Sequence, residues 1–206
     1  MALHVLRHPL ASAVLTELRD EKTQPRRFRR LCHRITTMLA IEATRTLPSC
    51  ERRVRTPVAE CAGSDIAVPV LVVPVLRAGL GMVDPLLDLL PDAQVGHVGI
   101  QRDEESAQPK PYYQKIPILR DHHIFIVDPM LATGGTLAHA VQSLKDRGGK
   151  NFTVLAIVAA PEGVKLMEEQ HPDVTIHTAS LDERLNEQKY IVPGLGDFGD
   201  RLMGTL

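Results

Sequence analysis

Continuous apolar runs that alternate with helical patterns limit the folds open to this chain more than any other feature of its sequence. Residues 68–76 (VPVLVVPVL), 123–127 (HIFIV) and 152–160 (FTVLAIVAA) lack the polar alternation of a strand with one solvated face, so each is predicted to be a strand covered on both faces. Helical patterns follow these runs at residues 80–90, 136–147 and 161–170. The alternation predicts an α/β fold with a mostly parallel, doubly wound sheet, in which ligands bind beyond the carboxyl ends of the strands.

The whole chain, residues 1–206, is expected to form a single domain with appendages. Its length is sufficient to bury a core without disulfides or a structural metal. We divide it into N-terminal helices over residues 1–48, an extended β-arm at 50–63, a core at 66–180 and a turn-rich tail at 181–206. The tail is rich in glycine and proline, which favours turns over a core element.

The middle of the core contains a polar interruption. A strand is predicted at residues 95–100, the proline-containing segment 103–115 is a candidate mobile flap, and 116–119 is expected to return as a strand.

Charge and cysteine usage limit the classes of partner. The formal net charge of -1 gives no electrostatic argument for nucleic acid or a membrane surface, and no stretch approaches the roughly 18 to 20 apolar residues that cross a bilayer. Cys32, Cys50 and Cys61 show neither metal-ligand spacing nor a disulfide framework. We therefore expect a cytoplasmic protein with no nucleic-acid partner and no membrane association.

The segment HHIFIVDPMLATGGT, residues 122–136, has the layout of a phosphate site. An apolar strand ends at Asp128, passes through a loop of small residues and opens a helix, which directs backbone N–H groups and a positive helix terminus at one point. Thr133 and Thr136 add hydroxyl donors, and the pair after Thr133, Gly134 and Gly135, allows close approach. A carboxylate beside a phosphate repels it, so Asp128 is expected to accept hydrogen bonds from sugar hydroxyls. The whole string predicts a ribose phosphate ligand, although two glycines alone would be an ordinary turn.

This string resembles the motif by which type I phosphoribosyltransferases bind 5-phosphoribosyl 1-diphosphate (PRPP). Its form with Pro129, Met130, Leu131 and Ala132 is similar to the uracil phosphoribosyltransferase family, and a single acidic residue, Asp128, fits that branch. The resemblance runs from HPL near residue 8 to the end of the chain. It implies the type I phosphoribosyltransferase fold, with transfer of the 5-phosphoribosyl group from PRPP to N1 of uracil, giving UMP and pyrophosphate in pyrimidine salvage. All nine residues from Asp128 to Thr136 would then contact PRPP.

Two arginines follow predicted strands, Arg77 in PVLRAGLGM and Arg102 in GIQRDEE. Taken singly, each would be a solvated charge at a strand end. Both strings resemble segments that contact the diphosphate in the family, and a guanidinium fork suits that anion. Residues 103–113 resemble the family's flexible loop, which is expected to cover the site.

The tail YIVPGLGDFGDR, residues 190–201, resembles the family's hood over the base. Uracil offers an acceptor, a donor and an acceptor along one edge, so a glycine-rich turn can select it through backbone groups. The resemblance assigns uracil contacts to Ile191, Gly196, Asp197 and Phe198, and places Asp197 near PRPP as well. Two residues depart from the family pattern: Lys189 where glycine is common, and Phe198 where a small residue is usual. A Phe198 ring in the pocket would alter base preference.

The resemblance also implies catalytic roles for Arg77, Arg102, Asp128 and Asp197, with Mg²⁺ held by PRPP oxygens and no certain side-chain ligand. It suggests a homodimer or homotetramer formed through the arm, and GTP as an effector. Two alternatives stay open. One is a phosphoribosyltransferase for another base. The other is a PRPP-responsive regulator that binds RNA through the basic run Arg26, Arg27, Arg29 and Arg30.

Overall fold

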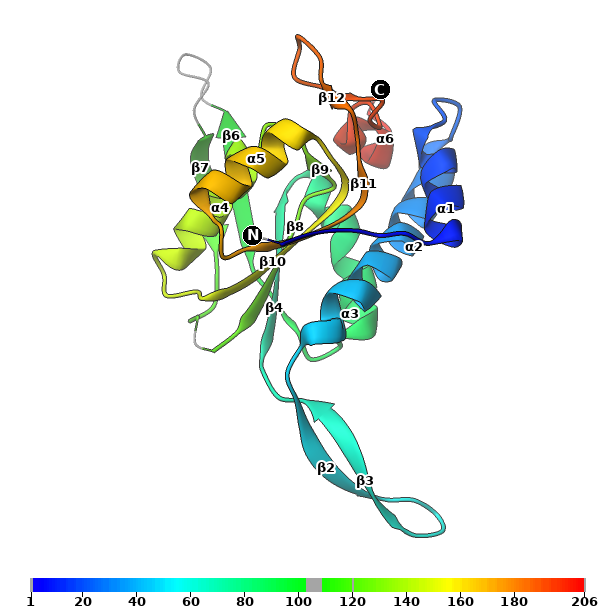
Figure 1. Cartoon of the computed structure of the whole chain (residues 1–206), viewed down its shortest axis with the longest axis vertical. Coiled ribbons are helices and arrows are strands. Elements are labelled where there is room, and N and C mark those ends of the chain that lie inside the picture. Colours follow the sequence, from blue (N-terminus) through cyan, green and yellow to red (C-terminus); the bar gives the residue numbers. More distant parts are fainter. Residues whose placement is uncertain (1, 103–108, 120, 206) are drawn as a thin grey trace.

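A large, mostly parallel sheet forms the centre of the protein, as the computed structural model of residues 2–102, 109–119 and 121–205 shows (Figure 1). Its strands, in spatial order, are β1 (Ala2–Val5), β11 (Thr175–Leu181), β10 (Asn151–Ala159), β8 (His123–Val127), β4 (Val70–Leu76), β6 (His97–Arg102) and β7 (Pro109–Lys115). The short strands β5 (Gln94–Val95) and β9 (Met130–Leu131) pair with β4 and β10. Each of these pairs is parallel except β6 with β7, which confirms the predicted fold class.

Helices cover both faces of this sheet. They are α1 (Pro9–Arg19), α2 (Pro25–Ala43), η1 (Thr44–Thr46), η2 (Ala78–Met82), α3 (Val83–Leu89), α4 (Gly135–Lys145), α5 (Pro161–Gln170) and α6 (Phe198–Met203). The helices α1, α2, α3 and α6 pack on one face, and α4 and α5 pack on the other. None of the helices in the described ranges is both long and apolar enough to span a bilayer.

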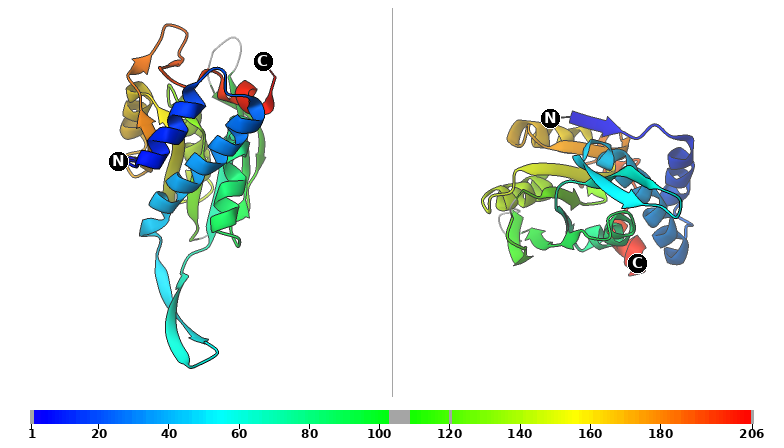
Figure 2. Two further views of the ribbon diagram at one scale, coloured as in Figure 1. Left: turned by 90° about the vertical axis from the view of Figure 1, so that its right-hand side faces the viewer. Right: turned by 90° about the horizontal axis from the view of Figure 1, so that it is seen from below.

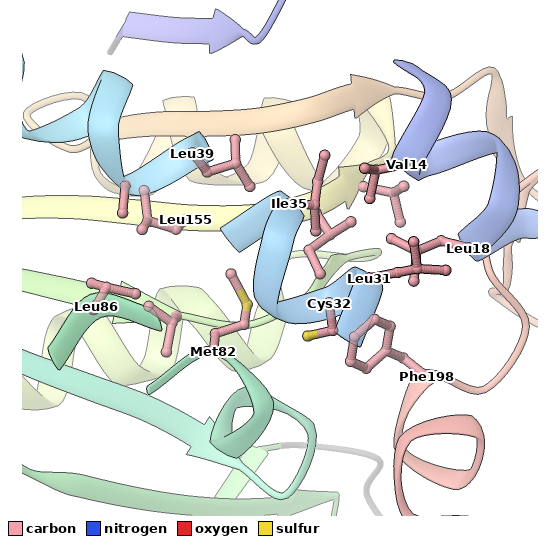
Figure 3. Close-up of a cluster of buried hydrophobic side chains, with 14 of the residues drawn as sticks. Val14, Leu18, Leu31, Cys32, Ile35, Leu39, Met82, Leu86, Leu155 and Phe198 are labelled. Atoms are coloured by element: carbon pink, nitrogen blue, oxygen red, sulfur yellow. The ribbon is translucent and has the colours of Figure 1, made fainter. Parts of the chain in front are cut away.

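Alternation along the strands produces two cores. In β4, Val70 and Val72 face the α2 side, whereas Leu71 and Val73 face α4, so a strand between two helical layers needs apolar residues at every position. The α2 side is the larger cluster, and Figure 3 shows α1, α2 and α6 converging there. Helix α2 enters this core because its apolar residues recur at helical spacing, with Phe28, Leu31, Ile35 and Leu39 all fully buried.

The arm segment forms an antiparallel hairpin of β2 (Ser49–Arg55) and β3 (Glu60–Ile66). Every residue of both strands is exposed. The hairpin projects from the end of the body opposite to the C-terminal tail (Figure 2).

The predicted strand at residues 116–119 is wrong, because the structure places β7 at Pro109–Lys115 instead. An edge strand can be polar and contain proline, since one of its sides forms no ladder, and Tyr113 is accordingly 46% exposed. Ile116 and Leu119 are apolar for a different reason, namely that they pack against the α4-side core. Part of the predicted flap, residues 103–108, lies outside the described residues.

The C-terminal tail contributes to the core, contrary to the prediction from its glycines. A two-stranded ladder joins β12 (Arg184–Leu185) to β13 (Ile191–Val192), a cis peptide precedes Pro193, and α6 follows. Phe198 and Leu202 on α6 are buried against the α2-side core. A six-residue helix is too short to show a helical period in the sequence, so the turn residues dominated the prediction.

Candidate active site

A crevice is expected where the strand order of the sheet reverses. The chain passes from β4 to β6 on one side of β4, then returns to β8 on the other side. The connections that follow β4 and β8 run in opposite directions along the sheet, so the loops at the carboxyl ends of these two strands are separated by a gap. A position of this kind, called a topological switch point, is the usual ligand site of an open α/β sheet. Figure 1 shows this edge at the end of the molecule away from the arm, with the tail beside it.

The loop after β8 forms a small hollow at this point. Asp128, Ala132, Thr133, Gly134 and other loop residues line a cavity of about 110 Å³. This is smaller than the roughly 300 Å³ of a small-molecule pocket, so the hollow fits one phosphate of a larger ligand. The N-terminus of α4 opens into it, directly after Gly134.

Glycines bring the backbone close together around this hollow. Gly134 has a φ of 83°, in the left-handed region, and a Cβ there would lie 2.8 Å from the Gly163 carbonyl oxygen. A Cβ on Gly163, in the first turn of α5, would clash with the carbonyl oxygen of Ala132. The loop is therefore packed against α5, with no room for side chains at either position.

Asp128 is the ionisable group at the end of β8. Burial raises the pKa of its carboxyl from 3.8 to about 7, and a hydrogen bond from the Met130 N–H to Oδ1, 3.2 Å long, offsets only part of that effect. Asp128 as a residue keeps some solvent access, so a ligand can reach it. Near neutral pH this carboxyl can lose its proton when a ligand supplies hydrogen bonds or positive charge.

The turn after β4 lies directly against Asp128. A Cβ on Gly79 would clash with the carbonyl oxygen of Val127, the residue before Asp128, so glycine is needed for this approach. Arg77 opens the turn after a cis peptide bond, and its side chain is exposed with no hydrogen bond or ion pair to the described residues. This leaves the guanidinium available to an anion in the crevice.

Arg102 is the last residue of β6, the strand next to β4. The register pairs Leu76 with Gly99, so β6 ends beyond β4 at the same edge of the sheet. The side chain of Arg102 lies outside the described part of the structure. The backbone alone thus brings this position to the edge that holds Arg77 and Asp128.

The tail presents Gly196 and Asp197 at the surface and buries Ile191 and Phe198. Asp197 is the N-cap of α6, where its Oδ1 accepts from the Asp200 N–H at 3.0 Å. Phe198 is 1% exposed, and its ring packs edge-on against Phe28, with centroids 4.9 Å apart. Figure 3 shows Phe198 within the α2-side core. The ring therefore points into the core, and only the backbone of Phe198 can take part in recognition.

Lys189 departs from the family pattern at a position with unusual backbone geometry. Its φ is 66°, in the left-handed region that favours glycine. Its N–H donates to the Asn186 carbonyl at 2.9 Å, and the Tyr190 N–H donates to the Asn186 side chain at 2.9 Å. These two hydrogen bonds to Asn186 stabilise the left-handed backbone conformation of Lys189.

The basic run on α2 is partly used inside the protein. Arg27 forms an ion pair with Glu17 at 2.6 Å, and Arg29 donates to the Leu202 carbonyl at 2.8 Å. Arg29, Arg30, His33 and Arg34 line a groove of about 550 Å³ beside η2 and α6. Two of the four arginines of the run, Arg27 and Arg29, therefore have partners within the protein.

Within the described ranges, no group of three or more His, Cys, Asp or Glu side chains is placed to hold a metal ion. The prediction from sequence missed other polar residues, namely Arg19 and Asp182, whose ion pair joins α1 to the tail across 163 residues of sequence.

Comparisons with known proteins agree with this geometry. The chain matches the family model described as "Uracil phosphoribosyltransferase" over residues 5–205. A uracil phosphoribosyltransferase from Bacillus cytotoxicus is 51% identical over 205 residues, covering 98% of each protein. The structure of AQ2163 protein from Aquifex aeolicus has a TM-score of 0.92 at 37% identity and covers 97% of each chain. The hypoxanthine-guanine phosphoribosyltransferase of L. donovani, at 13% identity, TM-score 0.52 and coverage of 77% of this chain and 81% of that one, shares the fold.

Proposed function

Since the chain belongs to the uracil phosphoribosyltransferase family, it transfers the 5-phosphoribosyl group from PRPP to uracil, and we propose that this occurs in the crevice between β4 and β8. The products are UMP and pyrophosphate, as pyrimidine salvage requires. One observation carries the location: the Arg77 turn and the loop after Asp128 meet at the strand-order reversal, where Gly79 lies against Val127.

PRPP would lie along this edge of the sheet. Its 5-phosphate fits the hollow formed by the loop that ends at Thr136, where backbone N–H groups and the α4 N-terminus face an anion. The Asp128 carboxylate would accept hydrogen bonds from the ribose hydroxyls. The diphosphate would extend towards the turn after β4, within reach of Arg77 and of Arg102 from β6.

Uracil would bind under the tail, which we call the hood (residues 181–206). The exposed turn at Gly196 and Asp197, with the backbone of Ile191 and Phe198, supplies N–H and C=O groups that match the uracil edge. This support comes from the backbone alone, because the side chains of Ile191 and Phe198 are buried.

Phosphoribosyltransferases generally use Mg²⁺ with PRPP, and the residues here fit that arrangement. Asp128 and Asp197 are two carboxylates at the proposed site, and one or two carboxylates with substrate phosphates are the usual magnesium environment. When bound, the ion would neutralise charge on the leaving diphosphate. The chain itself would hold the diphosphate through Arg77 and Arg102 and align uracil N1 with the ribose carbon. Catalysis would then be mainly positioning and electrostatic stabilisation, with no covalent intermediate.

We further propose a cytoplasmic homodimer or homotetramer in which the arm contacts a second copy. The arm is exposed along its length, and it presents several apolar side chains to solvent, namely Val54, Val58 and Ile66, which suits contact with a second copy. GTP is the proposed effector, and the cationic groove containing Arg30 and Arg34 is a suitable place for its phosphates. Sedimentation of the intact protein, with and without GTP, tests both statements.

The test of function is an assay for UMP from uracil, PRPP and Mg²⁺, with each component omitted in turn. We expect product only in the complete mixture. Cytosine and hypoxanthine, offered in parallel, test the alternative of another base. Nucleotide formed from either of them in preference to uracil would overturn the assignment of the substrate.

A further inference from the structure

A buried ion pair joins the end of α1 to the start of the hood. Arg19, the last residue of α1, donates from Nη2 to Asp182 Oδ1 at 2.6 Å and from Nη1 to Asp182 Oδ2 at 2.9 Å. The Asp182 side chain is 2% exposed and that of Arg19 is 24% exposed. Two parallel bonds fix both the distance and the orientation of the pair.

Both members of this pair also bind the backbone of one hood residue, Gly194. The Gly194 N–H donates to Asp182 Oδ2 at 2.9 Å, and its carbonyl accepts from Arg19 Nη1 at 2.8 Å. Gly194 has a φ of 61°, and a Cβ there would clash with the Ile191 carbonyl oxygen. Position 194 therefore accepts only glycine, and the pair fixes the directions of both the N–H and the C=O of that residue.

A second arginine fixes the next residue of the same turn. Arg201 Nη1 donates to the Leu195 carbonyl at 2.9 Å and to the Leu18 carbonyl at 2.6 Å. Leu18 precedes Arg19, so both arginines tie the turn to the last residues of α1. Gly196 and Asp197, proposed to meet uracil, follow immediately in the chain.

Stability alone does not account for a charged pair in this place. Burial would raise the pKa of Asp182, but the bonds from Arg19, Ser180 and Gly194 outweigh burial and hold it below its usual range. Buried ion pairs are often no more stabilising than apolar residues of similar size, although breaking one is costly. What this pair provides, and an apolar contact would not, is a fixed direction for the N–H and C=O of Gly194.

We propose that Arg19 and Asp182 are positioning residues that hold the base-binding turn in the geometry that accepts uracil. This inference rests on the proposed function of the hood. Neither residue is placed to touch PRPP, so removing the clamp should affect uracil far more than PRPP. The expected result is a raised KM for uracil with a nearly unchanged KM for PRPP.

The experiment compares Arg19→Met, Arg19→Lys and the control Arg27→Met. Arg27, on α2, forms an exposed ion pair with Glu17 of α1 and has no hydrogen bond or ion pair to the described residues of the hood, so its loss should leave kinetics unchanged. For Arg19→Met we expect KM for uracil to rise at least tenfold and KM for PRPP to change less than threefold. Arg19→Lys keeps the charge without the fork, so it should give an intermediate rise.

Hydrogen exchange of the peptide covering residues 190–197, measured without substrates, gives a second readout. It needs no enzymatic activity, so it still tests the proposal where Arg19→Met folds poorly. Loss of protection there in both Arg19 variants, together with the uracil-specific KM change, supports the proposal. Loss of protection with unchanged KM values, equal changes in both KM values, or unchanged exchange overturns it. A wild-type protein that forms no UMP would instead refute the proposed function, while exchange would still report whether the clamp holds the turn.

Discussion

The raised pKa of Asp128 predicts how PRPP binding depends on pH. With a pKa of about 7, the carboxyl is about 9% ionised at pH 6 and about 91% ionised at pH 8. If the ionised form binds the ribose hydroxyls, PRPP affinity should rise about tenfold between these values from this group alone. Binding at pH 7 should release about half a proton. Calorimetric titration with PRPP and Mg²⁺, without uracil, in two buffers of different ionisation enthalpy measures both quantities.

Asp128→Asn is the matched control, because the phosphate groups of PRPP titrate in the same range. The variant should bind PRPP more weakly at pH 8 and show only the pH slope of the ligand. Equal slopes and equal proton release in the two proteins would refute the reasoning, since they would mean that Asp128 does not titrate on binding.

The same shift has a consequence for the unliganded protein. The folded-state pKa lies above the ordinary value of 3.8, so between about pH 4 and pH 7 the folded chain binds more protons than the unfolded one. The contribution of Asp128 to stability is therefore complete below this window and is lost as pH rises through it. Asp128→Asn should raise Tm relative to wild type more at pH 8 than at pH 5, and a constant difference would contradict this account.

Three further predictions follow from the placement of other residues. Arg102→Ala and Asp197→Ala should each lower turnover of uracil and PRPP by well over tenfold, and unchanged rates would remove that residue from the mechanism. Phe198→Leu should lower the free energy of unfolding, measured by denaturant titration, by about 1–2 kcal/mol, because the ring packs on Phe28. KM for uracil should stay within about threefold of wild type. Unchanged stability with a large rise in KM for uracil would place the ring at the base. Lys189→Gly should stabilise the protein by about 0.5–1 kcal/mol, or about 2 °C in Tm, by removing a left-handed non-glycine residue, and a lower Tm would show that the lysine side chain contributes.

The parts of the fold that the sequence predicts are those in which neighbouring residues share one requirement, such as burial on both faces or a special backbone conformation. The strand at Val70–Leu76 is apolar at every position because both of its faces are covered, and the loop after Asp128 has a glycine at Gly134, where the backbone adopts a φ of 83°. Such requirements act within a few residues, so a single sequence reveals them. Edge strands carry weaker signals: β1 has four residues and β7 is polar, and neither shows a period.

The candidate site divides in the same way. Arg77 and Asp128 are predictable because each follows a buried strand, and parallel strands end at one edge. The hood was predicted as a base-binding segment but not as part of the core, because the burial of Phe198 depends on a contact with Phe28. That contact spans most of the chain and leaves no local pattern.

Recognition through backbone groups explains why the residues that support the hood are hard to find from sequence. A turn that binds through its N–H and C=O groups needs side chains only of a type that permits its backbone conformation. Gly194 and Gly196 permit it, because both have positive φ angles. The turn is held in place instead by Arg19, which is distant in sequence, and by Asp182 at the start of the hood. Uracil binding should therefore be more sensitive to Arg19, outside the base-binding motif, than to the Phe198 side chain within it.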